Sequence, residues 1–182
     1  MSLDYRIDRN DHIVAVNADW ERFAIENDAP DLATPPFDRP LWAYFASEQV
    51  VHVWQRLVRR VRTEQRAVQV PFRCDAPDTR RWLTMTVQAA TEDHVQFRSV
   101  LLREEPRAPV ALLDLAADRD PSALPLRMCA WCSRCHDGTS WVDIEDFVRT
   151  DRLLERDLLP PISHGICPDC IASMDAPESD AL

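Results

Sequence analysis

Glycine is almost missing from this chain of 182 residues, which contains only Gly138 and Gly165. A loop that wraps nucleotide phosphates needs several glycines close together, so the chain cannot form one. Basic residues are also outnumbered, 21 against 31 acidic ones, and the formal net charge is −10. Proteins that bind nucleic acid generally carry a basic surface, so we expect no nucleic-acid partner. The clustered arginines at 59, 60, 62 and 66 are better explained as the solvated face of a helix.

Long apolar runs are missing as well. No stretch approaches the roughly 20 apolar residues that a membrane helix needs. The N-terminal segment from Met1 to Asp8 also lacks the apolar stretch of a signal peptide. We therefore expect a cytoplasmic protein without membrane contact. Because thiols stay reduced in that compartment, the six cysteines favour metal binding or redox chemistry over disulfides.

The N-terminal half has the pattern of an antiparallel sheet combined with helices. Its predicted elements are strands at 5–7 and 12–16, a helix capped by Asn17 or Asp19, a proline-rich loop at 28–40, a long helix at 48–64, and strands at 68–74, 83–88 and 95–102. Apolar residues at helical spacing predict the buried stripe of the long helix: Val50, Trp54, Leu57, Val58 and Val61. Five antiparallel strands with helices on one face form an α+β domain.

Two stretches of this half carry a family resemblance. The first is Ile13-Val-Ala-Val-Asn17 with the following Asp19-Trp20, Phe23 and Ala24, and the second is Leu41-Trp-Ala-Tyr-Phe45. Together with the order of the elements, they resemble a PAS sensor domain over residues 1–104. The resemblance implies a PAS-like five-stranded antiparallel sheet, a small-molecule ligand between the sheet and the helices, and an association with other signalling proteins.

Several side chains of this half could serve a ligand, although packing explains them more simply. Five large residues could line a pocket, but a role in the core is favoured: Trp42, Trp54, Phe72, Trp82 and Met85. His52 lies near the edge of the apolar stripe, so a surface histidine is favoured over a haem ligand. We interpret Cys74 as an inward-facing strand residue, because a free cysteine behaves as a small hydrophobic residue.

Three arginines flank the predicted turn between two of the strands. Arg73, Arg80 and Arg81 could hold an anionic ligand because a guanidinium group binds carboxylates and phosphates. They could equally pair with Asp75 and Asp78 of the same hairpin. Ion pairs of this kind are common on protein surfaces, so pairing is favoured.

Two Cys-x-x-Cys pairs are the most specific chemical signal in the chain. Cys129 and Cys132 are separated from Cys167 and Cys170 by 34 residues. Four thiolates at this spacing can form a closed tetrahedral shell around one structural Zn²⁺ ion. We predict a Cys-rich zinc-binding module at 127–174, after a proline-rich linker at 105–126 and before a flexible tail at 175–182. A module this small has a thin core and usually needs a metal to fold.

The remaining residues of this module leave other ligand sets and chemistries open. Cys135, His136 or His164 could replace one of the four cysteines. Cys132 to His136 also matches the haem-attachment motif C-x-x-C-H, although that attachment normally needs export. Cys135 could act as a redox-sensing thiol next to the Cys-x-x-Cys pairs. Finally, the cysteines could be buried without a metal.

The module also carries a resemblance of its own. Its marks are the first Cys-x-x-Cys pair, a helix that begins at Trp141, and the closing Ser163-His-Gly-Ile-Cys-Pro-Asp-Cys170. It is similar to a small bacterial Cys-rich module that follows PAS and receiver domains in signalling proteins. That module usually has an aliphatic residue where Cys135 stands and a basic residue near His136.

The resemblances imply a bacterial sensor or adaptor in signal transduction. Such a protein would act through contacts with a signalling partner or through self-association. No acid–base or nucleophile set is evident in the sequence, and four cysteine ligands would leave a metal without an open position for substrate. We therefore expect no enzymatic activity. A thiol-based redox sensor that uses Cys135 is the alternative.

Overall fold

The structure is a computed structural model that describes residues 2–26, 39–150, 153 and 158–175. The predicted proline-rich loop at 28–40 and the predicted flexible tail at 175–182 lie almost entirely outside the described residues. Among the described residues, no helix is long and apolar enough to cross a lipid bilayer.

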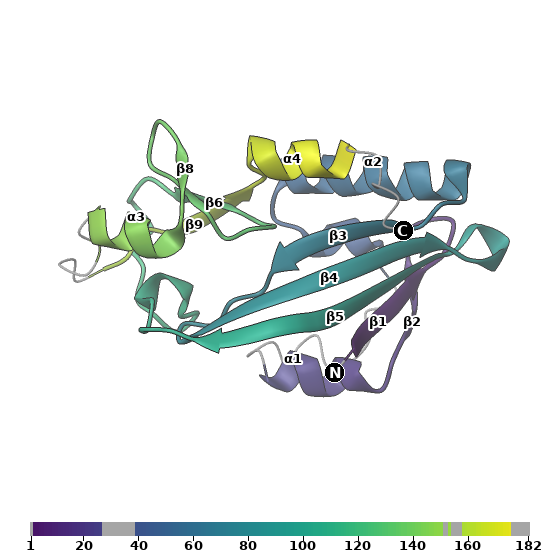
Figure 1. Ribbon diagram of the computed structural model, residues 1–182, viewed down its shortest axis with the longest axis horizontal. Coiled ribbons are helices and arrows are strands. Elements are labelled where there is room, and N and C mark those ends of the chain that lie inside the picture. Colours follow the sequence, from purple (N-terminus) through teal and green to yellow (C-terminus); the bar gives the residue numbers. More distant parts are fainter. Residues whose placement is uncertain (1, 27–38, 151–152, 154–157, 176–182) are drawn as a thin grey trace.

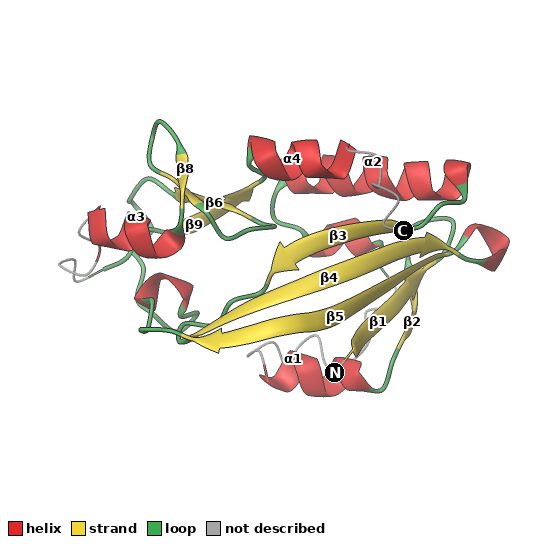
Figure 2. Ribbon diagram, viewed as in Figure 1, coloured by secondary structure: helices red, strands yellow, loops and turns green. Residues whose placement is uncertain are grey.

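A five-stranded antiparallel sheet forms the N-terminal part of the molecule (Figures 1 and 2). Its strand order is β2-β1-β5-β4-β3, and the strands are β1 (Ser2–Ile7), β2 (Ile13–Val16), β3 (Val68–Arg73), β4 (Thr79–Ala89) and β5 (Val95–Pro106). The predicted five-stranded sheet is thus confirmed. The last two strands are longer than predicted because β4 and β5 stay paired up to Thr79 and Pro106. The added ends of β4 and β5 consist mainly of polar residues, so the alternation of apolar and polar residues does not indicate that they are strands.

Helix α2 (Glu48–Glu64) has the bounds and the buried stripe that the sequence predicts. At its start, the Ser47 side chain accepts a hydrogen bond from the amide of Val50, at 3.4 Å. At its end, Gln65 adopts a left-handed conformation with φ of 55°. Helix α1 (Asp19–Glu26) is shorter, and a 3₁₀ turn (Leu41–Tyr44) precedes α2.

Both helices contact the same face of the sheet. On that face the rings of Tyr5 and Phe97 stack, with their centres 4.6 Å apart. Trp20 of α1 meets Tyr5 edge-on at 5.8 Å, and Trp54 of α2 lies 6.1 Å from Phe97. The aromatic residues therefore join the two helices to the central strands, in agreement with an α+β architecture that has its helices on one face.

Two tryptophans that the sequence offers as pocket residues lie outside the interior of the sheet domain. One of them is on the opposite face of the sheet. Trp82 lies on this face, where the guanidinium groups of Arg73 and Arg103 are 5.5 and 4.9 Å from its ring centre. Trp42 lies instead at the edge of the core, and its indole N–H donates a hydrogen bond of 2.6 Å to Asp11. Neither residue lines the interior of the domain.

The C-terminal part contains a second, smaller sheet that the sequence does not reveal. Its order is β8-β7-β6-β9, and its strands are β6 (Leu126–Cys129), β7 (Cys135–His136), β8 (Trp141–Val142) and β9 (Ile162–Gly165). Helix α3 (Ile144–Thr150) follows β8, and α4 (Pro168–Asp175) follows β9. Trp141 is therefore part of a strand, and the helix that was expected to begin there begins at Ile144. Strands of two to four residues are too short for a period to be recognised.

The two parts share buried contacts. Trp131, Ile166 and Cys167 of the C-terminal part belong to the same hydrophobic cluster as the sheet and α2. Val110 and Leu112, which fall in the predicted linker, are buried in a second cluster with β6 and α3. The domain boundaries at 104 and 126 stay a prediction, but these residues show that the segment between them is packed.

A buried ion network holds the segment after β5 in place. The side chain of Arg107 is only 4% exposed and lies 3.3 Å from Asp75 and 3.0 Å from Glu145. It also donates hydrogen bonds to the carbonyl oxygens of Ala76 and Pro77, at 2.6 and 3.2 Å. One cation therefore joins the turn between β3 and β4 to helix α3.

The arginines that flank this turn are paired with carboxylates. Arg73 pairs with Asp75, as the sequence suggests. Arg80 pairs with Glu145 of α3, at 2.7 Å, and Arg81 pairs with Glu104 of β5, at 3.0 Å. Two of the three partners thus come from outside the hairpin, because the fold brings α3 and β5 to its end.

We predict that Arg107→Met lowers the free energy of unfolding by about 3 kcal/mol, because it leaves buried carboxylates without their shared cation. Denaturant unfolding measures this loss. Arg98→Met is the matched control, since Arg98 is exposed and pairs with Asp4 at the surface. It should cost less than about 1 kcal/mol. Equal losses for the two variants would contradict a structural role for the network.

Candidate metal centre

The structure brings the two Cys-x-x-Cys pairs together. The Sγ atoms of Cys129, Cys132, Cys167 and Cys170 all lie within 4.8 Å of one another. In a tetrahedral site with Zn–S bonds of about 2.3 Å, neighbouring sulfur atoms are about 3.8 Å apart. The Cys132 and Cys167 sulfur atoms are separated by 3.8 Å. The arrangement is therefore compatible with zinc, and metal binding by these four residues stays a prediction.

Parallel pairing of β6 and β9 explains why the two pairs meet. In this register Cys129 lies opposite Gly165, and the amide of Ala130 donates to the Gly165 carbonyl oxygen at 2.8 Å. Cys167 follows only two residues after Gly165, so both loops leave the sheet at the same edge. A Cβ atom on residue 165 would lie 2.8 Å from the Nε atom of Arg127, so a larger residue here would displace that side chain.

The first loop is a tight turn closed by backbone hydrogen bonds. The amide of Ser133 donates to the Cys129 carbonyl oxygen at 3.0 Å, and the amide of Cys129 donates to the Arg134 carbonyl oxygen at 2.8 Å. Ser133 has φ of 59°, a left-handed conformation that glycine usually takes. This turn places Cys129 and Cys132 on the same side.

The second loop is the first turn of α4. The amide of Cys170 donates to the Cys167 sulfur at 3.4 Å, and the amide of Ile171 donates to the Cys167 carbonyl oxygen at 3.1 Å. The amide of Cys167 in turn donates to the sulfur of Cys129, at 3.4 Å. The N–H groups of Cys167 and Cys170 thus point at sulfur atoms and favour their thiolate form.

Arg134 is the one cation that touches the four-cysteine cluster, among the residues described. Its Nε atom lies 3.3 Å from the Cys132 sulfur and its Nη2 atom lies 3.4 Å from the Cys167 sulfur. It also pairs with Asp169 at 2.8 Å. Hydrogen bonds from Cys129, Cys170 and Arg134 hold the pKa of the Cys132 thiol well below its usual range. Four thiolates around a divalent ion would leave a net negative charge, which the guanidinium group of Arg134 is placed to stabilise.

The other candidate ligands lie apart from this cluster. Cys135 is completely buried in the second hydrophobic cluster, and burial raises the pKa of its thiol to about 12. The His136 ring packs edge-on against Trp141 at 5.3 Å, and its Nδ1 atom accepts a hydrogen bond from Gly138. His164 lines a hollow below α2. Within the described ranges, none of the three belongs to the metal-competent group.

The inner face of the large sheet also contains a cavity of about 320 Å³. Phe23 of α1 lines it together with side chains of β1, β4 and β5, among them Tyr5, Met85 and Ser99. Cys74 lines it as well, which agrees with the inward orientation expected for this residue. A neighbouring hollow of about 410 Å³ shares Tyr5 and Met85 and reaches the C-terminal part.

The side chains that line both spaces connect the cavity, through the second hollow, to the loop that contains Trp131. Phe72 and Met85 line both spaces, and Trp54, Trp131 and His164 line only the second. Of the residues that the sequence offers for a pocket, Trp54, Phe72 and Met85 thus face the interior. Trp131 was not singled out from the sequence, because its burial depends on a partner 77 residues away in the chain.

Known proteins provide no further guide. Comparisons of the chain with protein families, with curated proteins and with solved structures found no match. The interpretation of the site therefore depends on its geometry.

We predict that the purified protein contains about one Zn²⁺ ion per chain, and that Cys167→Ser abolishes binding because it removes one of four ligands. Metal analysis and thermal unfolding should show loss of the metal together with a lower melting temperature. For the metal content, Cys135→Ser is the control, since this thiol lies outside the cluster. A metal-free wild-type protein with unchanged stability would contradict the prediction.

Arg134→Met should weaken zinc binding by about 10- to 100-fold, because the thiolates lose the cation that contacts two of them. Competition with a chromogenic chelator measures the affinity. Arg127→Met is the matched control, because Arg127 lies in the same module but bonds to Gln49 and packs on Trp141, away from the sulfur atoms. If both variants release zinc equally, the contacts of Arg134 with the sulfur atoms are not responsible.

Proposed function

We propose that this protein is a signalling sensor or adaptor, in which a structural zinc centre is coupled to a PAS-like domain. The observation that carries the proposal is the position of Trp131. This residue stands between the two predicted ligands Cys129 and Cys132, yet its side chain is buried against α2. The metal-binding loop is thereby part of the core of the N-terminal domain.

Two contacts of Trp131 support this coupling. Its ring is only 3% exposed and stacks on Trp54 of α2, with centres 5.2 Å apart and an interplanar angle of 26°. Its carbonyl oxygen accepts a hydrogen bond of 2.7 Å from the amide of Arg73, at the end of β3. A displacement of the loop would therefore change the packing of both α2 and β3.

The set of four cysteine ligands supports a structural role for the proposed metal ion. We propose zinc because four closely spaced thiolates in a reducing cytoplasm favour a soft, redox-inactive ion, and because four protein ligands close the tetrahedral shell. A closed shell leaves no position at which a substrate could bind. The ion would therefore stabilise the fold and hold the two loops together.

The PAS-like assignment supports the sensor role. The predicted element order and the five-stranded antiparallel sheet agree with this family, and a cavity lies between the sheet and its helices. We propose that a small apolar molecule binds in this cavity. It would press on Tyr5, Phe72 and Met85, which also line the hollow next to Trp131. A ligand could thus shift the balance between two packings of α2, and a protein partner would read the difference.

The redox alternative has less support. A redox-sensing cysteine is normally exposed and has a low pKa. Cys135 has no exposed surface, and its raised pKa leaves little thiolate at neutral pH. We therefore do not propose a redox function for this thiol.

Removal of zinc with a chelator should raise amide hydrogen exchange in α2 and β3, and not only in residues 126–175. The physical reason is that Trp131 loses its fixed position when the loop between its ligands is released. Hydrogen exchange followed by mass spectrometry resolves the segments. Exchange that rises only in the C-terminal part would contradict the coupling.

Trp131→Leu provides the matching variant for this experiment. It should retain zinc but show faster exchange in α2, because the stack on Trp54 is lost. Trp82→Leu is the control, since it makes the same tryptophan-to-leucine change on the outer face of the sheet. If the two variants give the same exchange pattern, Trp131 does not connect the two parts.

A further inference from the structure

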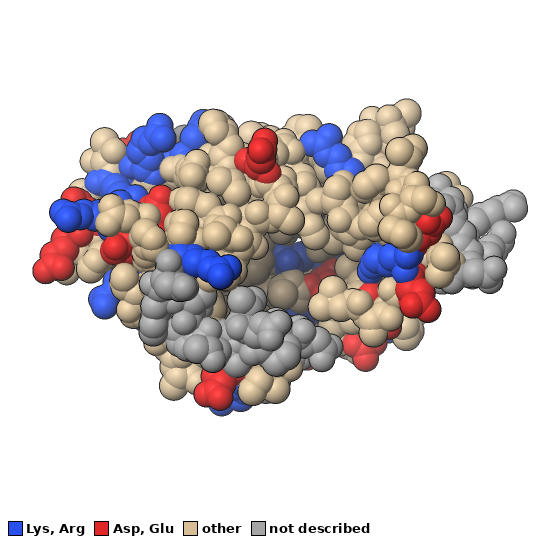
Figure 3. Space-filling model, turned by 180° about the vertical axis from the view of Figure 1, so that it is seen from behind, with Lys and Arg blue, Asp and Glu red and all other residues tan. Residues whose placement is uncertain are grey.

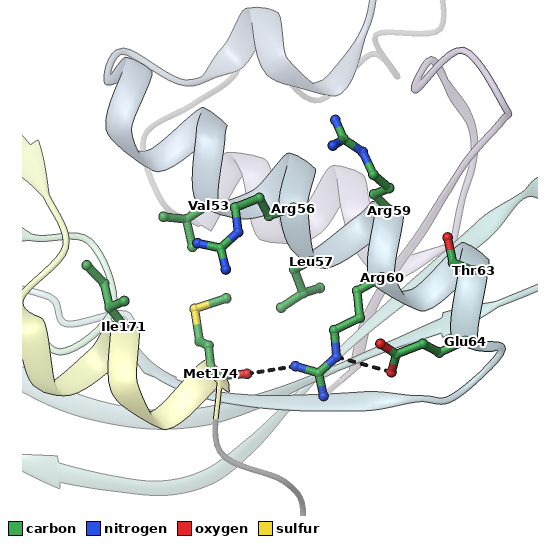
Figure 4. A pocket seen from close by; sticks show the side chains of 9 residues that line it. All are labelled: Val53, Arg56, Leu57, Arg59, Arg60, Thr63, Glu64, Ile171 and Met174. Atoms are coloured by element: carbon green, nitrogen blue, oxygen red, sulfur yellow. Dashed lines mark hydrogen bonds and ion pairs between the residues drawn. The ribbon is translucent and has the colours of Figure 1, made fainter.

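A groove of about 390 Å³ runs between α2 and α4 (Figure 4). Its base is apolar, with Val53 and Leu57 from α2 and Ile171 and Met174 from α4. Figure 4 shows these side chains facing one another across the groove. The volume of the groove and its apolar base suit side chains of another polypeptide.

The rim of the groove is basic. Arg56, Arg59 and Arg60 of α2 line it at helical spacing, whereas Glu64 is the one carboxylate that lines it in the part of the chain that the structure describes. Figure 4 shows Arg60 bonded to the carbonyl oxygen of Met174 and to Glu64, at 3.2 and 3.3 Å. From behind, basic and acidic side chains lie interspersed on the side of the molecule where α2 ends (Figure 3). The lining of the groove itself is mainly basic and contrasts with the net charge of −10 of the whole chain.

We infer that this groove binds an acidic, amphipathic segment of a partner protein. Apolar side chains of the segment would enter the groove between Leu57 and Met174, and its carboxylates would pair with the arginines of the rim. All 21 basic residues of the chain are arginines, whose planar guanidinium groups suit bidentate contacts with carboxylates. A nucleic acid fits less well, because its phosphates would be repelled by the overall charge and would leave the apolar base uncovered.

The zinc centre controls one wall of this groove. Helix α4 begins at Pro168 and contains the predicted ligand Cys170, and Ile171 follows it directly. Release of the metal would free the start of α4 and separate Ile171 and Met174 from α2. This inference rests on the proposed function, because it identifies the surface through which the adaptor would contact its partner.

The test selects ligands without assuming their sequence. A phage-displayed library of random peptides of about 16 residues, enough for four helical turns, is panned on the zinc-loaded full chain. The expected ligands are rich in Asp and Glu and carry apolar residues three or four positions apart. Enrichment of basic peptides, or no enrichment at all, would overturn the inference.

The affinity of a selected, fluorescein-labelled peptide is then measured by fluorescence anisotropy. The double variant Arg56→Glu with Arg59→Glu should weaken binding by at least about tenfold, and added salt should weaken it as well. Arg98→Glu, on the outer face of the large sheet, should leave the affinity unchanged. If the variants do not differ, or if an oligonucleotide competes equally well, the groove is not the docking site for an acidic protein segment.

Zinc removal separates this inference from the proposed function. Binding should be lost with the metal, because α4 no longer forms its wall. A zinc-loaded protein whose α2 responds to metal removal, but which selects no acidic peptide, would refute the groove and leave the coupling intact. A protein that binds the acidic peptide equally well without zinc would refute the role of the metal in assembling the groove.

Discussion

The crowding of four thiols is the constraint on which the C-terminal part depends. Four sulfur atoms within 4.8 Å of one another cannot all be ionised unless a cation lies between them. The surroundings nevertheless favour thiolates, because the amides of Cys167 and Cys170 and the guanidinium group of Arg134 donate to the sulfur atoms. A divalent ion would resolve this conflict, and its four side-chain ligands would form one junction at the ends of β6 and β9. The backbone pairing of β6 with β9 brings the two loops together, and the ion would hold them and the start of α4 in place.

Two further contacts connect this junction to the large sheet. Trp131 enters the core formed by α2 and the sheet, while Arg107 joins the turn between β3 and β4 to α3. One contact is apolar and the other is ionic, and both bury the groups involved. The aromatic stack lies beside the hollow on the inner face, and this hollow shares Tyr5, Phe72 and Met85 with the interior cavity. The groove between α2 and α4 is a second consequence, because α4 begins at the four-cysteine cluster and the carbonyl oxygen of its Met174 accepts a hydrogen bond from Arg60.

The sequence predicts the regular elements well where one physical period dominates. The stripe from Val50 to Val61 has helical spacing over about three turns, and the structure contains that helix with the same bounds. The strands of the large sheet alternate clearly except at the polar ends of β4 and β5. The small sheet was missed because its strands have two to four residues, which is too few for a period to emerge. Trp141 was placed in a helix because its spacing with Ile144 and Phe147 is helical, but pairing with β7 makes it part of a strand.

The sequence by itself determined the residue types of the site: two Cys-x-x-Cys pairs whose thiols can bind a soft metal, in a chain with almost no glycine and an excess of acidic residues. Local spacing suffices for this, because each pair closes its own turn. The tertiary structure alone decided which side chains surround the site. Parallel pairing of β6 with β9 brought the two loops together, folding turned Cys135 away into a separate core, and long-range packing placed Trp131 on Trp54. These outcomes depend on contacts between residues far apart in the chain, and no local pattern records them.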